Sequence, residues 1–138
     1  MSQNADTIGY YEGPRTFGSA IVICLTNYVG FSGRAPRSEY WWFVLFGIIV
    51  DIVAGLLDFV LNISVLYPIC ALALLLPSLA VAIRRLHDIG RSGWWWLIIF
   101  VPLVGAILLL VWACTAGTRG QNQYGPDPLA SGAWRAAA

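Results

Sequence analysis

The sequence has few charged residues and contains no lysine. Only 11% of its 138 residues are charged and 59% are hydrophobic, with a mean hydropathy of +0.72, whereas soluble domains average about 25% charged residues. This balance excludes an ordinary soluble domain and predicts an integral membrane protein. All eight positive residues are arginine, which we attribute to codon usage, although arginine also suits bidentate contacts with phosphate and carboxylate groups.

Paired cysteines and the common catalytic motifs are also missing. Cys24, Cys70 and Cys114 lie far apart and form no C-x-x-C pair, so the sequence predicts neither a metal site nor a disulfide framework. We interpret them as small apolar packing residues. The sequence has no Gly-rich phosphate loop, no H-E-x-x-H motif and no nucleophile elbow. We therefore expect no enzymatic activity, no metal, no cofactor and no nucleic-acid partner.

Three apolar runs are long enough to cross a bilayer, which takes about 20 residues. They cover residues 40–61, 64–83 and 94–114. Pro68 and Pro77 interrupt the second run, which a membrane helix tolerates when neighbouring groups satisfy the freed carbonyls. The predicted fold class is an all-α integral membrane protein with three transmembrane helices.

The flanking segments are shorter or polar. Residues 17–31 are uncharged and moderately apolar but too few to form a span, and we interpret them as an amphipathic helix lying in the membrane interface. A short or tilted fourth span is the alternative. Residues 1–16 form a polar N-terminal tail, and residues 117–138 are rich in turn formers and predict an irregular C-terminal tail. Gly90 predicts a helix stop, and Ser92 predicts the cap of the next helix.

Two short motifs hold five of the eight arginines and five of the seven tryptophans. They span residues 31–42 and 84–96, and each ends in aromatic residues that lead into an apolar run, as expected at a membrane interface. With three spans, all five arginines lie on one side, which the positive-inside rule makes cytoplasmic, and the C-terminal tail lies outside. Only a re-entrant last segment, bending at Pro102 and Gly105, brings this tail back to the arginine side.

The candidate site is a group of polar residues from these two motifs, which we call the arginine collar. Its members are Arg34, Arg37, Arg84, Arg85, His87, Asp88 and Arg91. On one interpretation they bind an anionic lipid headgroup or another phosphate-bearing ligand. On the other, the arginines set the topology and pair with acidic residues to hold the interfacial helix against the bundle.

Within the arginine collar, helical spacing allows Arg84 to contact His87 and Asp88. A His-Asp catalytic dyad is disfavoured, because adjacent helix positions point about 100 degrees apart. We expect His87 to form a hydrogen bond with Glu39 or a lipid phosphate, and since histidine titrates near neutral pH, a pH-sensing role stays open.

Asp51 is the second anomaly, because its position places a carboxyl group near the middle of the bilayer. Asp58 lies on the same face near the far interface. An unpaired charge at the bilayer centre costs about 2.5 to 3.5 kcal/mol. Asp51 is either a proton or cation site, or a neutral carboxyl hydrogen-bonded to a backbone carbonyl that Pro68 or Pro77 has freed.

The order of the motifs resembles a known family of small bacterial inner-membrane proteins, catalogued as domain of unknown function number eight hundred and five. The matching patterns are F-x-G-R-x-x-R-x-E-Y-W, R-R-L-H-D-x-G-R-S-G-W-W and G-T-x-G-x-N-x-Y-G-P-D-P. The resemblance covers residues 28–128 and implies a multi-pass protein of the bacterial inner membrane. It brings no catalytic residues with it.

The function predicted from these features is non-enzymatic. The arginine collar is expected to bind anionic membrane lipids or a partner membrane protein, and roles as an accessory subunit or a homo-oligomer are open. The alternative is a small transporter, channel or proton-coupled element that uses Asp51.

Overall fold

The computed structural model describes residues 14–129, so most of the N-terminal tail and residues 130–138 lie outside the described part. This part of the chain is helical and contains no strand, which confirms the all-α prediction. Its elements in chain order are α2 (Phe17–Thr26), α3 (Arg37–Leu61), α4 (Leu66–Asp88), the 3-10 helix η1 (Gly93–Phe100) and α5 (Val104–Cys114).

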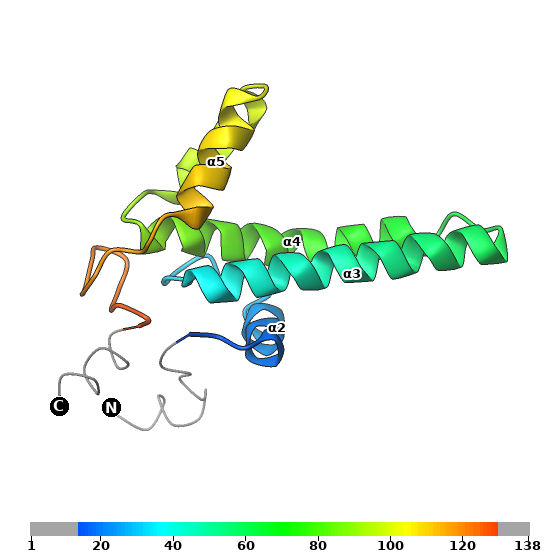
Figure 1. Cartoon of the computed structure of the whole chain (residues 1–138), viewed down its shortest axis with the longest axis horizontal. Helices are drawn as coiled ribbons and strands as arrows, with labels where there is room; N and C mark the ends of the chain where they lie inside the picture. Colours follow the sequence, from blue (N-terminus) through cyan, green and yellow to red (C-terminus); the bar gives the residue numbers. More distant parts are fainter. Residues whose placement is uncertain (1–13, 130–138) are drawn as a thin grey trace.

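Helices α3 and α4 form a long antiparallel hairpin (Figure 1). They have 25 and 23 residues, and an 18-residue stretch of each has a mean hydropathy of 2.5 and 2.2, respectively. At 1.5 Å per residue, each helix is about 35 Å long. Both are therefore long and apolar enough to cross a membrane. We call the end where α3 begins and α4 finishes the loop end, and the end formed by residues 62–65 the far end.

An aspartate closes the far end of the hairpin. Asp58 is buried, and its carboxylate accepts hydrogen bonds from the backbone N–H groups of Leu66 and Tyr67, each at 2.9 Å. These are donors of the first turn of α4, which no carbonyl of the helix itself can reach. Asn62 reverses the chain just before this turn with a φ of 53°, a conformation that asparagine tolerates better than most residues.

The two prolines of α4 are accommodated in different ways. Pro68 lies in the first turn of α4, where its missing N–H would have no helical acceptor anyway. Pro77 lies inside the helix and leaves the carbonyl of Ala73 without its usual donor. The hydroxyl of Tyr28 donates a hydrogen bond to that carbonyl. The partner of the freed carbonyl is therefore Tyr28, and not Asp51 as one sequence interpretation suggested.

The prediction of a third transmembrane helix is wrong, because residues 14–129 contain two candidate spans. Residues 94–114 instead form η1, a reversal at residues 101–103, and α5, which runs back along η1. Pro102 cannot continue a helix, and Leu103 adopts a φ of 66°. A Cβ atom on Gly105 would lie 1.7 Å from the carbonyl oxygen of Ile98, so this close approach requires glycine.

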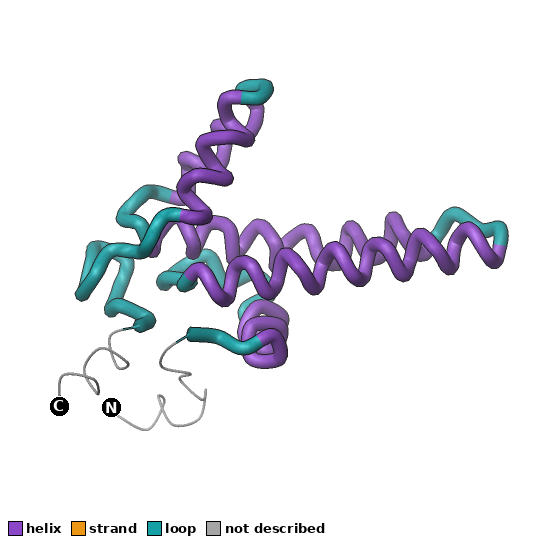
Figure 2. The backbone as a smooth tube through the Cα atoms, viewed as in Figure 1, coloured by secondary structure: helices purple, strands orange, loops and turns teal. Residues whose placement is uncertain are grey.

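The reversal brings both ends of the η1–α5 pair to the loop end of the hairpin, as the re-entrant alternative predicted. In Figure 1 this pair projects from α4 as a second, shorter arm. Figure 2 shows that the loops before α3, between α4 and η1, and after α5 gather at the loop end. The segment after α5 thus lies beside the arginine-bearing motifs.

Helix α2 runs across α3 and α4 instead of along them and appears end-on in Figure 1. It ends at Thr26, earlier than the predicted residue 31, and begins with a capping box formed by Thr16 and Ser19. Its ten residues extend about 15 Å, half the thickness of a bilayer core. Its buried face carries Ala20 and Cys24. Its placement in the membrane interface stays a prediction.

Candidate functional site

The loop end of the hairpin is built around Asp88, the last residue of α4. Its carboxylate lies between two guanidinium groups, 3.0 Å from that of Arg34 and 2.6 Å from that of Arg85. All three side chains are buried. A buried charge is tolerated only when it is paired and hydrogen-bonded. Here the carboxylate of Asp88 pairs with two arginines, one from each of the two sequence motifs.

A second buried pair joins α3 to α4. The guanidinium group of Arg84 donates to the carboxylate of Glu39, which also lies 3.4 Å from Arg15. Arg84 therefore pairs with Glu39 and not with Asp88, whose oxygens are occupied by other arginines. Cys24 lies beside this pair, and burial and the neighbouring Glu39 raise the pKa of its thiol to about 12. The thiol stays protonated, in keeping with a packing role.

The buried arginines also hold the segment that follows α5. Arg34 donates to the carbonyls of Thr118 and Gly120, the latter at 2.7 Å. Arg85 donates to the carbonyl of Ala113 at 3.2 Å. A Cβ atom on Gly117 would lie 2.2 Å from Asp88, so the chain passes directly over this carboxylate. The first, second and third motifs of the sequence therefore meet in one network.

His87 belongs to this network but has partners that the sequence analysis did not predict. Its ring stacks on Tyr124 with 4.0 Å between the centroids, and its Nδ1 lies 3.0 Å from the carbonyl oxygen of Gly33. Because a carbonyl only accepts, Nδ1 carries the proton in this contact. Asn122 donates to the backbone carbonyl of His87. The expected hydrogen bond to Glu39 is not formed, since Glu39 faces Arg84.

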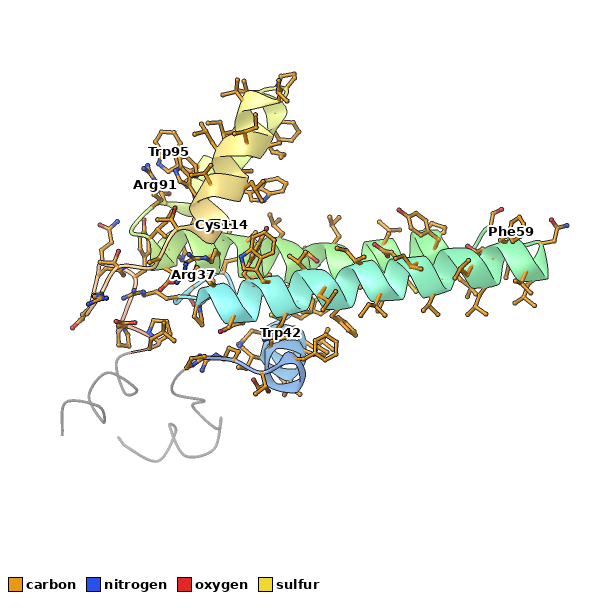
Figure 3. All side chains as sticks on the ribbon, in the orientation of Figure 1. Arg37, Trp42, Phe59, Arg91, Trp95 and Cys114 are labelled. Carbon is orange, nitrogen blue, oxygen red and sulfur yellow. The ribbon has the colours of Figure 1, made fainter. Side chains whose placement is uncertain are left out.

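The remaining arginines at the loop end are exposed. Among the described residues, Arg37, Arg91 and Arg119 have no carboxylate within 4.0 Å. The guanidinium group of Arg91 lies 4.4 Å from the ring centroid of Trp112, a cation–π arrangement. Arg37 donates to the carbonyl of Cys114 at 3.1 Å, and the two residues lie at the same end of the molecule (Figure 3).

Arg37 lies at the edge of an open cleft of about 760 Å³ between the start of α3 and the segment after α5. Ser38 and Arg119 also line it, as does Asp127, whose carboxylate accepts from the backbone N–H of Gly120 at 3.0 Å. Asp88 reaches the cleft as well, but its charge is balanced by its two arginine partners. Together, Arg34, Arg37, Arg85 and Arg119 outnumber the two aspartates Asp88 and Asp127, so the cleft and its immediate surroundings are electropositive.

Asp51 lies apart from this end, in the middle of α3. Its Oδ1 atom is buried and has no hydrogen-bond partner among the described residues. Between residues 14 and 129, no three His, Cys, Asp or Glu side chains lie close enough together to hold a metal ion. Guanidinium and hydroxyl groups such as those at the loop end can recognise anions.

Sequence reasoning missed the residues after α5 that complete the site. Asn122 and Tyr124 belong to the G-T-x-G-x-N-x-Y-G-P-D-P pattern, which was noticed but placed on the opposite side of the membrane. The sequence did contain a signal for this placement. The polar motif is long and specific, yet on the predicted side of the membrane it had no other motif to contact. Asp58 was also missed as a cap, although it stands a few residues before α4 begins.

Comparison with known proteins shows which sequences this chain is similar to. Inner membrane protein YhaI of Escherichia coli K12 is 52% identical over 106 residues, covering 75% of this chain and 90% of its own length. Inner membrane protein YhaH of the same strain is 47% identical over 110 residues, covering 75% and 91%. No solved structure is significantly similar. The family described as "Protein of unknown function (DUF805)" matches residues 28–126, from Tyr28 through the segment that contacts His87, and the chain therefore belongs to the DUF805 family.

Proposed function

We propose that this chain is a non-enzymatic inner-membrane protein that binds anionic lipid headgroups at the loop end of its helical hairpin. The observation that carries the proposal is Arg37, which is exposed in an electropositive cleft with no carboxylate partner among residues 14–129. Arg119 adds a second positive charge, and Ser38 supplies a hydroxyl donor. A phosphate group is matched by such a set of donors.

The geometry divides the arginine collar into two roles. Arg34, Arg84 and Arg85 are buried and paired with Asp88 or Glu39, so the proposal assigns them to holding the fold together. The proposal assigns Arg37 to ligand binding. This division favours the structural interpretation for the three buried arginines and the binding interpretation for Arg37.

The placement in the membrane is part of the proposal. Two relatives are named inner membrane proteins, and α3 and α4 are long and apolar enough to cross a membrane. The arginines cluster at the loop end, which the positive-inside rule makes cytoplasmic. The chain then crosses the membrane twice, with its cleft at the depth of the cytoplasmic lipid headgroups. A partner membrane protein or a second copy of the chain could use the same surface.

The test compares Arg37→Gln with Arg91→Gln, because both residues are exposed arginines of the arginine collar but only Arg37 lines the cleft. Purified protein is equilibrated with phosphatidylethanolamine vesicles containing phosphatidylglycerol, and the bound phosphatidylglycerol is counted by native mass spectrometry. A charge-assisted contact is worth about 1.5 to 3 kcal/mol, so Arg37→Gln should lower affinity more than about tenfold.

Arg91→Gln should retain the lipid, and Arg37→Lys, which keeps the charge, should recover part of the binding. Equal phosphatidylglycerol retention by Arg37→Gln and the parent protein would contradict the proposal. The melting temperature of each variant in detergent shows whether the fold is intact.

A second candidate function rests on the buried, unpartnered Oδ1 atom of Asp51. An intramembrane acid without a partner is typical of proton and cation sites. If Asp51 carries ions, Asp51→Asn should abolish pH-driven flux in proteoliposomes while leaving the melting temperature unchanged. Absence of flux in the parent protein would remove this candidate.

A further inference from the structure

A second hollow lies next to the cleft, on the outer face of the first turns of α3. It has a volume of about 460 Å³ and is lined by Arg37, Ser38, Trp41, Trp42 and Leu45. Arg37 and Ser38 line both hollows, so the two meet at these residues. We call the second hollow the tryptophan groove.

The lining changes from polar to apolar along the tryptophan groove. Arg37, Trp41 and Leu45 are spaced four residues apart and so lie on one face of α3. At 1.5 Å per residue, they extend about 12 Å along the helix, from the loop end toward its apolar middle. Trp42 and Leu45 remain 39% and 41% exposed, so their apolar surface is open to an occupant.

An amphiphile fits the order of these groups. In a bilayer, a phospholipid places its phosphate at the interface and its acyl chains toward the membrane centre. The combined site has the same order, with the guanidinium group at the loop end and the tryptophan and leucine side chains deeper along α3. Tryptophan suits the region between headgroups and chains, because its ring is largely apolar but carries one N–H donor. That donor of Trp42 is directed to the carbonyl of Arg15 at 3.1 Å.

We propose that the cleft and the tryptophan groove form one site for an anionic phospholipid, with the phosphate at Arg37 and an acyl chain along Trp41, Trp42 and Leu45. The inference rests on the proposed function and extends it, because it adds a surface for an acyl chain beside the headgroup site, which a free phosphate compound would not use. A soluble headgroup would satisfy Arg37 but leave the tryptophan groove exposed.

The test uses two leucines of α3 as a matched pair. Leu45→Gln places a polar group in the tryptophan groove, whereas Leu56→Gln does so at an exposed position farther along the helix, outside it. Retention of phosphatidylglycerol from mixed vesicles is measured for both by native mass spectrometry. Losing one apolar side-chain contact of about 1 kcal/mol should reduce affinity about fivefold in Leu45→Gln, with no change in Leu56→Gln.

A competition arm separates the two possible sources of the phosphate. Glycerol 3-phosphate presents the same phosphate group without acyl chains and should fail to displace the lipid at concentrations where short-chain phosphatidylglycerol displaces it. Effective displacement by glycerol 3-phosphate would overturn the inference.

The outcomes also distinguish this inference from the proposed function. If Arg37→Gln loses the lipid while Leu45→Gln retains it, headgroup binding stands and the acyl-chain site is overturned. If neither variant loses the lipid, both proposals fail. Loss in both variants, with retention in Leu56→Gln and Arg91→Gln, supports the complete site.

Discussion

At the scale of single residues, burial decides what each arginine of the arginine collar does. Arg34 and Arg85 share Asp88, and Arg84 is paired with Glu39, all inside the protein. Charges in such positions are costly to expose unpaired. Arg37 and Arg91 belong to the same motifs but stand outside this network. The sequence shows the five arginines as equivalent, and only the fold separates them.

Arg34→Gln should strongly destabilise the protein, because it leaves Asp88 with one arginine partner and frees the carbonyls of Thr118 and Gly120. Breaking a buried ion pair costs about 3 to 5 kcal/mol. The matched control is Arg91→Gln, which loses only cation–π contacts with Trp95 and Trp112, each worth about 0.5 to 1 kcal/mol. Denaturant unfolding in detergent, followed by tryptophan fluorescence, measures both. Equal losses would show that the Arg34 pair contributes little.

At the scale of elements, individual glycine, serine and proline residues explain where the helices begin and end and where the chain turns. Gly90 has a φ of 78°, and the N–H of Arg91 donates to the carbonyl of Leu86 at 2.9 Å, which is the Schellman ending expected for a helix that stops at glycine. Ser92 caps η1 through its side chain. Both signals were readable from the sequence, because capping depends on neighbouring residues.

The break within residues 94–114 was harder to read from the sequence. Hydropathy counts apolar residues and is the same for one span or for a folded-back pair. Two tertiary contacts decide the fold of this segment. Gly105 packs closely on Ile98, and at the loop end Arg34 donates a hydrogen bond to the segment after α5. The third-span prediction failed because it took residues 94–114 as one continuous helix, whereas the chain reverses at residues 101–103.

Gly105→Ala should disrupt the η1–α5 pair, because the added methyl group overlaps the carbonyl of Ile98. Gly55→Ala is the matched control, since a Cβ atom on Gly55 meets nothing within 4 Å and alanine favours a helix by about 1 kcal/mol. Limited proteolysis of the segment after α5 should speed up in Gly105→Ala and stay slow in Gly55→Ala. Equal protection in both variants would argue against the close approach.

The hydrogen bond from Tyr28 to Ala73 predicts a coupling between Tyr28 and Pro77. Tyr28→Phe should cost about 1 kcal/mol, because the carbonyl freed by Pro77 loses its donor. In a Pro77→Ala background the helix regains a backbone N–H for that carbonyl, so the same substitution should cost much less. Unfolding of the four proteins gives the coupling as a double-mutant cycle. Additive losses would contradict the assigned role of Tyr28.

At the scale of the whole molecule, the helical class and the two long spans could be predicted from hydropathy, and the family from its motifs. The direction of the last segment and the convergence of three motifs could not, because they depend on contacts between residues up to 91 positions apart, as between Arg34 and Gly125. The end of the hairpin at which the arginines gather could be predicted by counting them along the sequence. Which arginines of the arginine collar are buried and which are exposed depends on tertiary contacts, and the sequence does not show these.

Cysteine labelling in a cysteine-free background tests this arrangement. Ser92→Cys and Gln123→Cys should be labelled by a membrane-impermeant reagent from the same side, because the chain reverses between them. Ile63→Cys, at the far end of the hairpin, should be labelled from the opposite side. Labelling of positions 92 and 123 from opposite sides would contradict the reversal and support a continuous third span.

The arginine–carbonyl contacts at the loop end also impose an order on how the protein is made. Synthesis proceeds from the N-terminus, so the carbonyls of Thr118, Gly120 and Gly125 are among the last partners of Arg34 to leave the ribosome. Helices α3 and α4 can enter the membrane together before these groups exist. Closure of the loop end can therefore follow insertion, because a nascent chain that stops after Cys114 has both spans and the buried ion pairs but lacks the three carbonyls that Arg34 contacts after α5.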